Sequence, residues 1–276
     1  FVGSHDHFLY AINIEDGEEV WKFETNGPIQ SSPAVDEESV YIGSDDGFLY
    51  AIDREGGDQV WVYDAGGAVR SSPVIANGVV YVGSDSHKLF AIDKVTGKGK
   101  WEHETGGPLT SSPYPYEGRI LIGSHDNNLY ILNIKNRGSE NQFPTGAAIE
   151  STSVVHGERA FFGSNDGYLY AVDVTTGGGV WKYAASSIDS DNYNLEETEN
   201  AQPQEIHAIK SPPTIANERV YFGTSKGYVL AVHELSGALM GWYRTEEMVS
   251  SSPLLMNGLI YFGSKDGSIC AVRDID

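Results

Sequence analysis

The sequence predicts an all-β fold, a β-propeller of about seven four-stranded blades, and two observations carry this prediction. The first is a Gly-Ser dipeptide that recurs at intervals of 40 residues, with one interval of 60 and one Gly-Thr variant. A fixed period of about 40 residues is typical of repeat architectures. The second is that each repeat contains short β-type segments and turn signals, with no apolar period of a helix. The dipeptides are Gly3-Ser4, Gly43-Ser44, Gly83-Ser84, Gly123-Ser124, Gly163-Ser164, Gly223-Thr224 and Gly263-Ser264.

The repeat that begins at residue 41 shows why four strands are expected. Asp46-Gly47 separates two apolar segments and is a strong hairpin signal, because both residues tolerate the positive φ of a type I′ turn. Gly56-Gly57 turns the chain again before a segment that carries Trp61. The predicted strands are 41–44, 48–53, 59–64 and a last one that opens at Ser71-Ser72-Pro73.

A blade is counted here with the Ser-Ser-Pro segment as its first strand, the Gly-Ser segment as its second, the Leu-Tyr-Ala segment as its third and the tryptophan segment as its fourth. This count gives five complete blades and two incomplete ones: the N-terminal blade lacks the first strand and the C-terminal blade lacks the fourth. We therefore expect one propeller domain over 1–276 that is cut from a ring of seven or eight blades, because closed rings leave no sheet edges. About 20 extra residues, at 184–209, form an inserted loop. We expect a surface loop there, with a lid or a partner contact as the alternative.

Composition and charge restrict the class of function. The formal net charge is −21, from 39 acidic and 18 basic residues, which argues against nucleic acid as a partner. A solvated acidic coat explains the charge, and adaptation to high salt is the alternative. No apolar run is long enough for a transmembrane segment. Cys270 is the only cysteine, so no internal disulfide can form.

A family resemblance rests on the segment Leu49-Tyr50-Ala51-Ile52-Asp53 with Gly57 and Trp61, which recurs at 89–101 and 169–181. This pattern resembles the tryptophan-docking repeat of pyrroloquinoline-quinone-type (PQQ-like) β-propellers. The family includes quinoprotein dehydrogenases, the lipoprotein of the bacterial outer-membrane barrel-assembly machinery, and scaffolds that bind no quinone. The resemblance implies an extracytoplasmic location, periplasmic or secreted. It also implies that the tryptophans dock onto the neighbouring blade: Trp21, Trp61, Trp101, Trp181 and Trp242.

The best candidate for a ligand or partner face is the residue that precedes each Ser-Ser-Pro motif. It differs in every repeat, whereas the residue before it is always apolar. The strand that follows each Ser-Ser-Pro motif is the innermost strand of its blade, and alternation at its start turns the polar residues toward the central channel. We therefore expect a protein or a small ligand to bind there. The alternative is a channel that is lined by ordinary polar groups. The set is Gln30, Arg70, Thr110, Glu150, Lys210 and Ser250.

Charge refines the expectation for this face. Arg70 and Lys210 provide positive charge on an acidic protein, which favours an anionic group, although Glu150 and Lys210 come from adjacent repeats and can pair. The turn residues that follow Gly-Ser also suggest a metal, but the repeats separate them and Asp-Gly suits the turn itself, so no metal is predicted. These residues are Asp6, Asp46, Asp126, Asp166 and Asp266, with His5, His7, His87 and His125.

The favoured function is a non-catalytic binding scaffold without a cofactor. A PQQ-dependent dehydrogenase is the alternative that the resemblance raises, and it needs calcium with six or more oxygen ligands. At the candidate face only Glu150 is a carboxylate and only Gln30 an amide, which is too few. A ligand-sensing ectodomain of a larger receptor is a third possibility. No Ser-His-Asp, Walker or dinucleotide motif indicates an enzyme.

Overall fold

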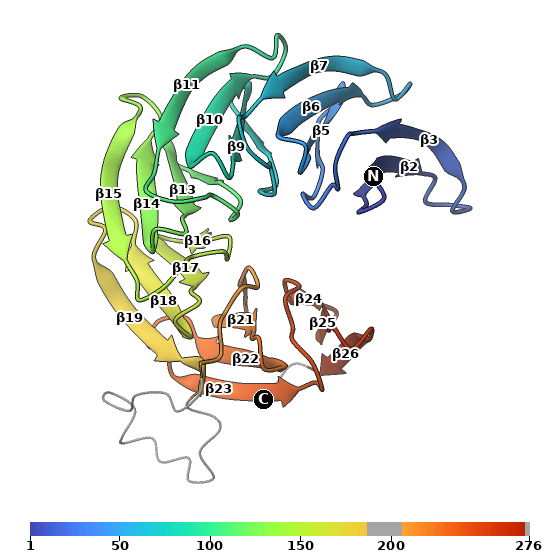
Figure 1. Cartoon of the computed structure of the whole chain (residues 1–276). Coiled ribbons are helices and arrows are strands. Elements are labelled where there is room, and N and C mark those ends of the chain that lie inside the picture. The colour runs from blue at the N-terminus through green and yellow to red at the C-terminus, as the bar shows by residue number, and fades with distance from the viewer. Residues whose placement is uncertain (187–205, 274–276) are drawn as a thin grey trace. The chain divides into compact units, whose positions relative to one another are not determined.

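The fold is built from β-strands, as predicted. A computed structural model describes residues 1–186 and 206–273, which form 26 strands and no α-helix (Figure 1). No helix in this part of the chain is long and apolar enough to span a membrane. The inserted loop predicted at 184–209 lies largely outside the described residues, at 187–205.

The strands form seven antiparallel sheets, five with four strands and two with three, which confirms the count from the sequence. In each sheet the strands pair in the order of the chain. The first three sheets are β1 (Val2–Gly3), β2 (Phe8–Ile12) and β3 (Glu19–Glu24); β4 (Ala34–Val35), β5 (Ser39–Gly43), β6 (Phe48–Asp53) and β7 (Gln59–Asp64); and β8 (Val74–Ala76), β9 (Val79–Gly83), β10 (Lys88–Asp93) and β11 (Gly99–Glu104).

The remaining sheets repeat this plan. They are β12 (Tyr114–Tyr116), β13 (Arg119–Gly123), β14 (Asn128–Asn133) and β15 (Gly138–Pro144); β16 (Val154–His156), β17 (Arg159–Gly163), β18 (Tyr168–Asp173) and β19 (Gly179–Ala184); β20 (Thr214–Ala216), β21 (Arg219–Gly223), β22 (Tyr228–His233) and β23 (Leu239–Arg244); and β24 (Leu254–Met256), β25 (Leu259–Gly263) and β26 (Ile269–Arg273).

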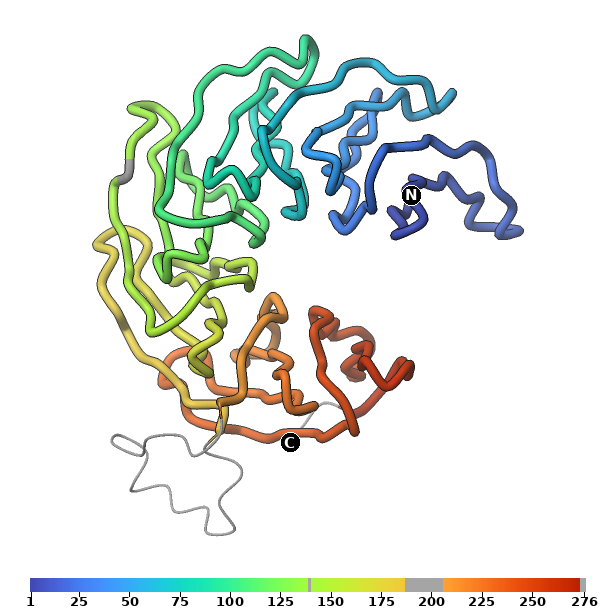
Figure 2. The backbone as a smooth tube through the Cα atoms, viewed as in Figure 1, coloured from blue at the N-terminus to red at the C-terminus, as the bar shows by residue number. Residues whose placement is uncertain are grey.

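The chain divides into two compact units, which we describe separately. Unit 1 comprises residues 1–126 and 132–140, and unit 2 comprises 127–131 and 141–276, so that strands β14 and β15 contribute to both. Within each unit, consecutive sheets follow one another along the chain trace (Figure 2). The prediction of a single domain over 1–276 stays a prediction.

Each first strand begins just after a Ser-Ser-Pro motif or a variant of it, and in five sheets the first serine of the motif fixes the position of this segment. Ser71 Oγ donates to the carbonyl of Gly83 (2.9 Å) and accepts from the amide of Gly83 (2.7 Å), so one hydroxyl joins the chain before β8 to the end of β9. Four other sheets use the same pair of bonds, through Ser31, Ser111, Ser211 and Ser251.

The sheet β16–β19 departs from this arrangement. Its motif reads Ser151-Thr152-Ser153, and Ser151 Oγ donates to the carbonyl of Ser211 at 3.0 Å instead. Ser153 stands where the other motifs have proline, and its buried Oγ has no hydrogen-bond partner among the described residues. The motif is therefore structural in the regular sheets and altered in this one.

Tryptophan docking joins consecutive sheets. The Trp61 indole lies against Gly97, where an added Cβ would come within 2.7 Å of the ring, and Trp61 Nε1 donates to the Lys94 carbonyl at 3.0 Å. Gly97 has a φ of +67°, a left-handed conformation that favours glycine. The same contacts join Trp21 to the turn 54–57 and Trp181 to the turn 234–237.

Two of the fourth strands differ from this pattern. Asn141, which replaces a tryptophan, lies against Gly177 and donates from Nδ2 to the Thr175 carbonyl (3.1 Å), so the amide keeps the hydrogen bond of the indole. Trp242 was predicted to dock, but Gly241 occupies the docking position opposite Ala231, and Trp242 lies one residue further, on the other face of β23. The turn that would correspond to 94–97 follows β26 and lies outside the described residues.

The aspartates of the second-to-third-strand turns also join sheets. Asp46 Oδ2 accepts from the Tyr50 hydroxyl (2.8 Å) and from the backbone amide of Asn26 (2.9 Å), which follows β3 of the preceding sheet. Burial raises the pKa of Tyr50, and the bond to Asp46 raises it further. Asp166 makes the same bonds to Tyr170 and to the amide of Gly146. These carboxylates therefore have a structural use.

A paired replacement in the third sheet supports this interpretation. Phe90 stands where Tyr50 stands in the sheet before, and Ser86 stands where Asp46 does. Ser86 Oγ donates to the Ala65 carbonyl at 2.7 Å, so this turn still contacts the preceding sheet without a carboxylate. The third sheet therefore lacks both the tyrosine hydroxyl and the aspartate carboxylate that are hydrogen-bonded to each other in the second sheet.

An ion pair adds to these contacts at the other end of the strands. Lys94 Nζ, in the turn after β10, lies 2.8 Å from Asp36 Oδ2, in the turn after β4. Burial of the Asp36 carboxyl opposes its ionisation, but Lys94 and the amides of Ser39 and Glu38 outweigh burial and lower its pKa to about 2. In unit 2, His156 and Glu234 occupy the corresponding positions at 2.7 Å, with the acidic and basic partners exchanged.

Replacing Asp46 with serine should destabilise the protein, and a second change should restore part of the loss. Asp46→Ser leaves the buried Tyr50 hydroxyl without its acceptor, so we expect the free energy of unfolding to fall by about 1–3 kcal/mol. Asp46→Ser with Tyr50→Phe, which copies Ser86 and Phe90, should be less destabilised than the single variant. Urea unfolding measures both. Tyr50→Phe alone is the second single variant. If the loss of unfolding free energy in the double variant equalled the sum of the losses in the two single variants, the side chains of Asp46 and Tyr50 would not be energetically coupled.

Candidate partner-binding face

The chain that leads to each first strand lies between two sheets, and this places the candidate residues. Val69 is fully buried, and its amide donates to the carbonyl of Ser44 in the preceding sheet (2.9 Å). The next residue, Arg70, points the other way, and 40% of its side chain is exposed. The same backbone bond recurs at Ile29, Leu109, Ile209 and Val249. The alternation predicted from the sequence is therefore present.

In unit 1, the candidate residues contact side chains that the sequence analysis did not assign to this face. Gln30 Nε2 donates to Asp45 Oδ2 at 2.7 Å, and Arg70 Nε donates to the other oxygen of Asp45 at 3.1 Å. Arg70 Nη1 also donates to Asp85 Oδ2 at 2.5 Å. One guanidinium thus bridges carboxylates of two consecutive sheets, which fixes its orientation. Thr110 Oγ1 and His125 Nε2 form a separate pair at 2.8 Å.

In unit 2, Glu150 is the centre of a second network. Lys210 Nζ lies 2.9 and 3.0 Å from the two Glu150 oxygens, so the expected pairing of these residues is found. Asn165 Nδ2 donates to Glu150 Oε1 at 2.7 Å. Of the Lys210 side chain 37% is exposed. Ser250, the last candidate, is exposed.

These networks define one polar face in each unit: Gln30, Arg70 and Thr110 with Asp45, Asp85 and His125 in unit 1, and Glu150, Lys210 and Ser250 with Asn165 in unit 2. The four added residues directly follow the Gly-Ser dipeptides, fifteen positions after their partners. The signal that could have found them is present in the sequence, because this position also differs between repeats. It reads His5, Asp45, Asp85, His125, Asn165, Ser225 and Lys265.

The contacts change the expected charge of the face. Arg70 lies between two carboxylates and Lys210 lies on a third, so neither cation is available alone for an anionic group. In the unit 1 network Asp45 and Asp85 outnumber Arg70, which favours basic or hydrogen-bond-donating groups of a partner. The attraction for an anion expected from the sequence is therefore offset in this network.

The same contacts test whether the face fits a quinone with calcium. Both oxygens of Glu150 are engaged by the Lys210 ammonium, and Gln30 directs its amide nitrogen to Asp45. Glu150 is the only carboxylate among the six predicted residues, so a calcium ion bound there would have to displace the ammonium group of Lys210. The residues present do not fit the group. Among residues 1–186 and 206–273, no cluster of three or more His, Cys, Asp or Glu could hold a metal ion.

Comparison with known proteins agrees with this fold. The family model described as outer membrane protein assembly factor BamB matches residues 1–183 and 65–276, which together span the chain. A search of curated proteins found no match. BamB from Moraxella catarrhalis is 16% identical, with a TM-score of 0.79 over 99% of this chain and 80% of that one. The computationally designed Ika8 protein is 13% identical, with a TM-score of 0.65 over 99% and 92%. The predicted β-propeller fold and its PQQ-like repeat are confirmed.

Proposed function

We propose that this chain, which belongs to the family of the outer membrane protein assembly factor BamB, is a non-catalytic scaffold that binds a protein partner through the polar face of each unit. The observation that carries the proposal is the contrast between a constant frame and variable polar side chains. Val69 and its counterparts are buried in every repeat, whereas the next residue differs each time and is never apolar. Since the frame does not dictate these residues, they are available for recognition.

The geometry of the face is better suited to binding a partner than to catalysing a reaction. Its ionised groups are engaged with one another, as Arg70 is with Asp45 and Asp85, and Lys210 with Glu150. Such pairs hold long side chains in one orientation, which lowers the entropy lost when a partner is bound. More than a third of the Arg70 and Lys210 side chains remains exposed, so a partner can reach them.

The family suggests the kind of partner and the location. BamB is described as a factor in outer membrane protein assembly, and we extend this to the present chain. The proposed partner is a protein of that assembly process, and the proposed location is extracytoplasmic. The two networks differ in charge, so the partner surface should present basic or donor groups to Asp45 and Asp85 and uncharged polar groups to the neutral pair of Glu150 and Lys210.

Photo-cross-linking from Ser250 in cell envelopes of the source organism tests this proposal. Ser250 is exposed, and a cross-linking amino acid at that position leaves both networks intact. We expect an adduct with an outer membrane assembly protein, identified by mass spectrometry. Arg70→Ala with Lys210→Ala should reduce the adduct strongly, while the melting temperature changes little, because exposed ion pairs contribute about 0–1 kcal/mol each.

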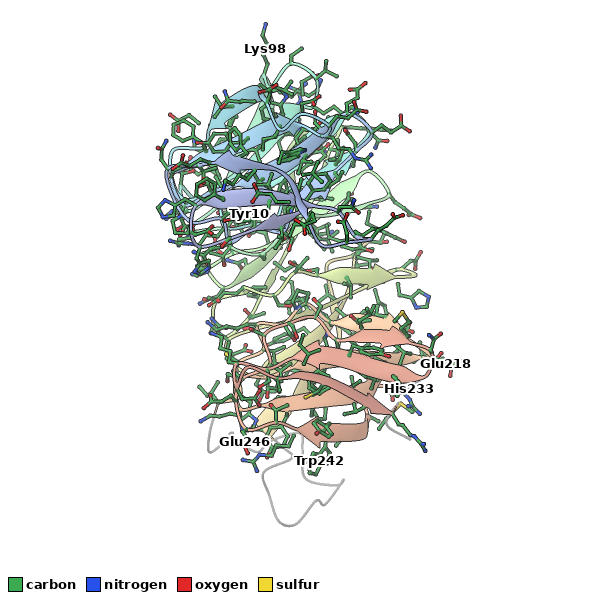
Figure 3. The ribbon with its side chains drawn as sticks, turned by 90° about the vertical axis from the view of Figure 1, so that its right-hand side faces the viewer. Tyr10, Lys98, Glu218, His233, Trp242 and Glu246 are labelled. Carbon is green, nitrogen blue, oxygen red and sulfur yellow. The ribbon has the colours of Figure 1, made fainter. Side chains whose placement is uncertain are left out.

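The matched control removes two lysines from the opposite ends of the strands. Lys98 and Lys135 are exposed in third-to-fourth-strand turns, and Lys98 is labelled in Figure 3. Lys98→Ala with Lys135→Ala changes the net charge by the same amount and should leave the adduct unchanged. Loss of the adduct in the control, with retention in Arg70→Ala and Lys210→Ala, would place binding at the other end of the sheets.

The absence of a quinone cofactor is a separate prediction. Adding PQQ with calcium should leave the melting temperature within about 1 °C of the apoprotein, since a ligand that binds only the native state must raise it. Calcium alone and PQQ alone are the controls. A rise of several degrees that requires both components would contradict the prediction and favour a dehydrogenase.

A further inference from the structure

An exposed tryptophan marks a second surface, on β23 in unit 2. Trp242 pairs with Leu230 of β22, and 51% of its surface is exposed. Because alternate residues of a strand share one face, Arg244 lies on the same side as Trp242, and Met240 is the extra residue of the bulge that precedes Gly241. Met240 and Arg244 are exposed as well. Figure 3 shows Trp242 at the outer border of its sheet. We name Met240, Trp242 and Arg244 the β23 stripe.

The other fourth strands have different residues at the positions of Trp242 and Arg244. Where β23 has Trp242, they have Lys22, Val62, Glu102, Gln142 and Lys182. Charged residues on an edge strand usually prevent pairing with other chains, and three of these five are charged. Where β23 has Arg244, the three complete fourth strands of unit 1 end in Glu24, Asp64 and Glu104. The β23 stripe therefore has an aromatic residue where no other fourth strand has one, and a basic residue where the three fourth strands of unit 1 have an acidic one.

The stripe rests on a buried aromatic ring that holds it in place. Trp242 packs edge-on against Tyr228, with ring centroids 5.8 Å apart at 73°. The Arg244 guanidinium lies 5.0 Å from the centre of the same ring. Tyr228 is itself buried and stacks on His207, at 5.6 Å and 16°. A tryptophan and an arginine supported in this way are the residue types that dominate binding energy at protein interfaces.

The backbone next to the stripe is open for pairing. β23 is the outermost strand of the sheet β20–β23, so no strand of the described residues pairs with its outer edge. An edge of this kind can accept an extended segment of another protein as an additional strand. At its end the stripe meets a groove of about 700 Å³, lined by residues 243–246 and by Asp266, Ser268 and Cys270.

We propose that the β23 stripe binds an extended, acidic segment of another protein, which adds as a fifth strand to the sheet β20–β23. An apolar side chain of the segment packs on Trp242, and a carboxylate pairs with Arg244. The choice of an acidic segment rests on Arg244, the one charged residue of the stripe, and a second copy of this chain is the alternative occupant that the test below must exclude. The stripe is on a fourth strand, whereas the polar face precedes the first strands, so this proposal does not depend on the proposed function.

The test uses a blocked ten-residue peptide of alternating valine and glutamate, labelled for fluorescence anisotropy. The whole chain should bind this peptide. A version with lysine in place of glutamate should bind at least about tenfold more weakly, because it opposes Arg244. A version N-methylated at alternate amides, which cannot form strand hydrogen bonds, should also lose at least about tenfold.

Variants then locate the binding. Trp242→Lys and Arg244→Glu should each weaken it at least about tenfold, whereas Trp242→Phe should retain most of it. The matched control is Val62→Lys, at the corresponding position of β7, which should change binding by less than about twofold. Circular dichroism and thermal unfolding check that each variant is folded.

Several results would overturn the proposal. These are an absence of binding of all three peptides, equal loss in Val62→Lys and Trp242→Lys, and full retention in Trp242→Lys with its fold intact. A further result that would overturn the proposal comes from sedimentation velocity of the chain without peptide. A dimer that Trp242→Lys dissociates would identify a second copy, and not an acidic partner segment, as the occupant of β23.

Discussion

The contact between a tryptophan on one sheet and a left-handed glycine on the next is the constraint on which the rest of the structure depends. A small sheet of three or four strands cannot bury both of its faces alone, so its stability requires a neighbour. Trp61 provides that contact through the ring on Gly97 and the hydrogen bond to the Lys94 carbonyl. The positive φ of the glycine and the missing Cβ are both required, because the ring occupies the place of a side chain.

This constraint leaves other positions free, and those positions carry the proposed functions. The residues that form the frame, Trp61 and Asp46 between sheets and Ser71 within a sheet, recur with their partners. Arg70 and Lys210 follow buried residues that are fixed by the frame, yet they differ between repeats. The β23 stripe arises in the same way, because Gly241 occupies the docking position and Trp242 faces outward. Departures from the repeat therefore point to recognition more directly than the repeat itself.

Much of the fold could be predicted from the sequence, because turn chemistry and strand period are local properties. Asp46-Gly47 and the Gly-Ser dipeptides predicted the positions of the hairpins, and alternation predicted that Arg70 points to the side opposite the buried Val69. The partners of Arg70 could not be predicted, since Asp45 lies in the preceding sheet and Asp85 in its own. Trp242 was assigned wrongly by residue type, although it follows Gly237 by one residue more than Trp61 follows Gly57. A shift of one residue moves a side chain to the other face of the strand, so the register of the strand, and not the residue type, determines whether a tryptophan can dock.

The measurement that tests the docking constraint most directly compares two glycine substitutions by urea unfolding. Gly78 has a φ of +75° with open space around it, whereas Gly97 has a φ of +67° and faces the Trp61 ring. Gly78→Ala should cost about 1 kcal/mol, from backbone strain alone. Gly97→Ala should cost about 3 kcal/mol or more, because the added methyl group also displaces the indole. Equal losses in the two variants would show that the tryptophan contact does not govern stability and would contradict the account.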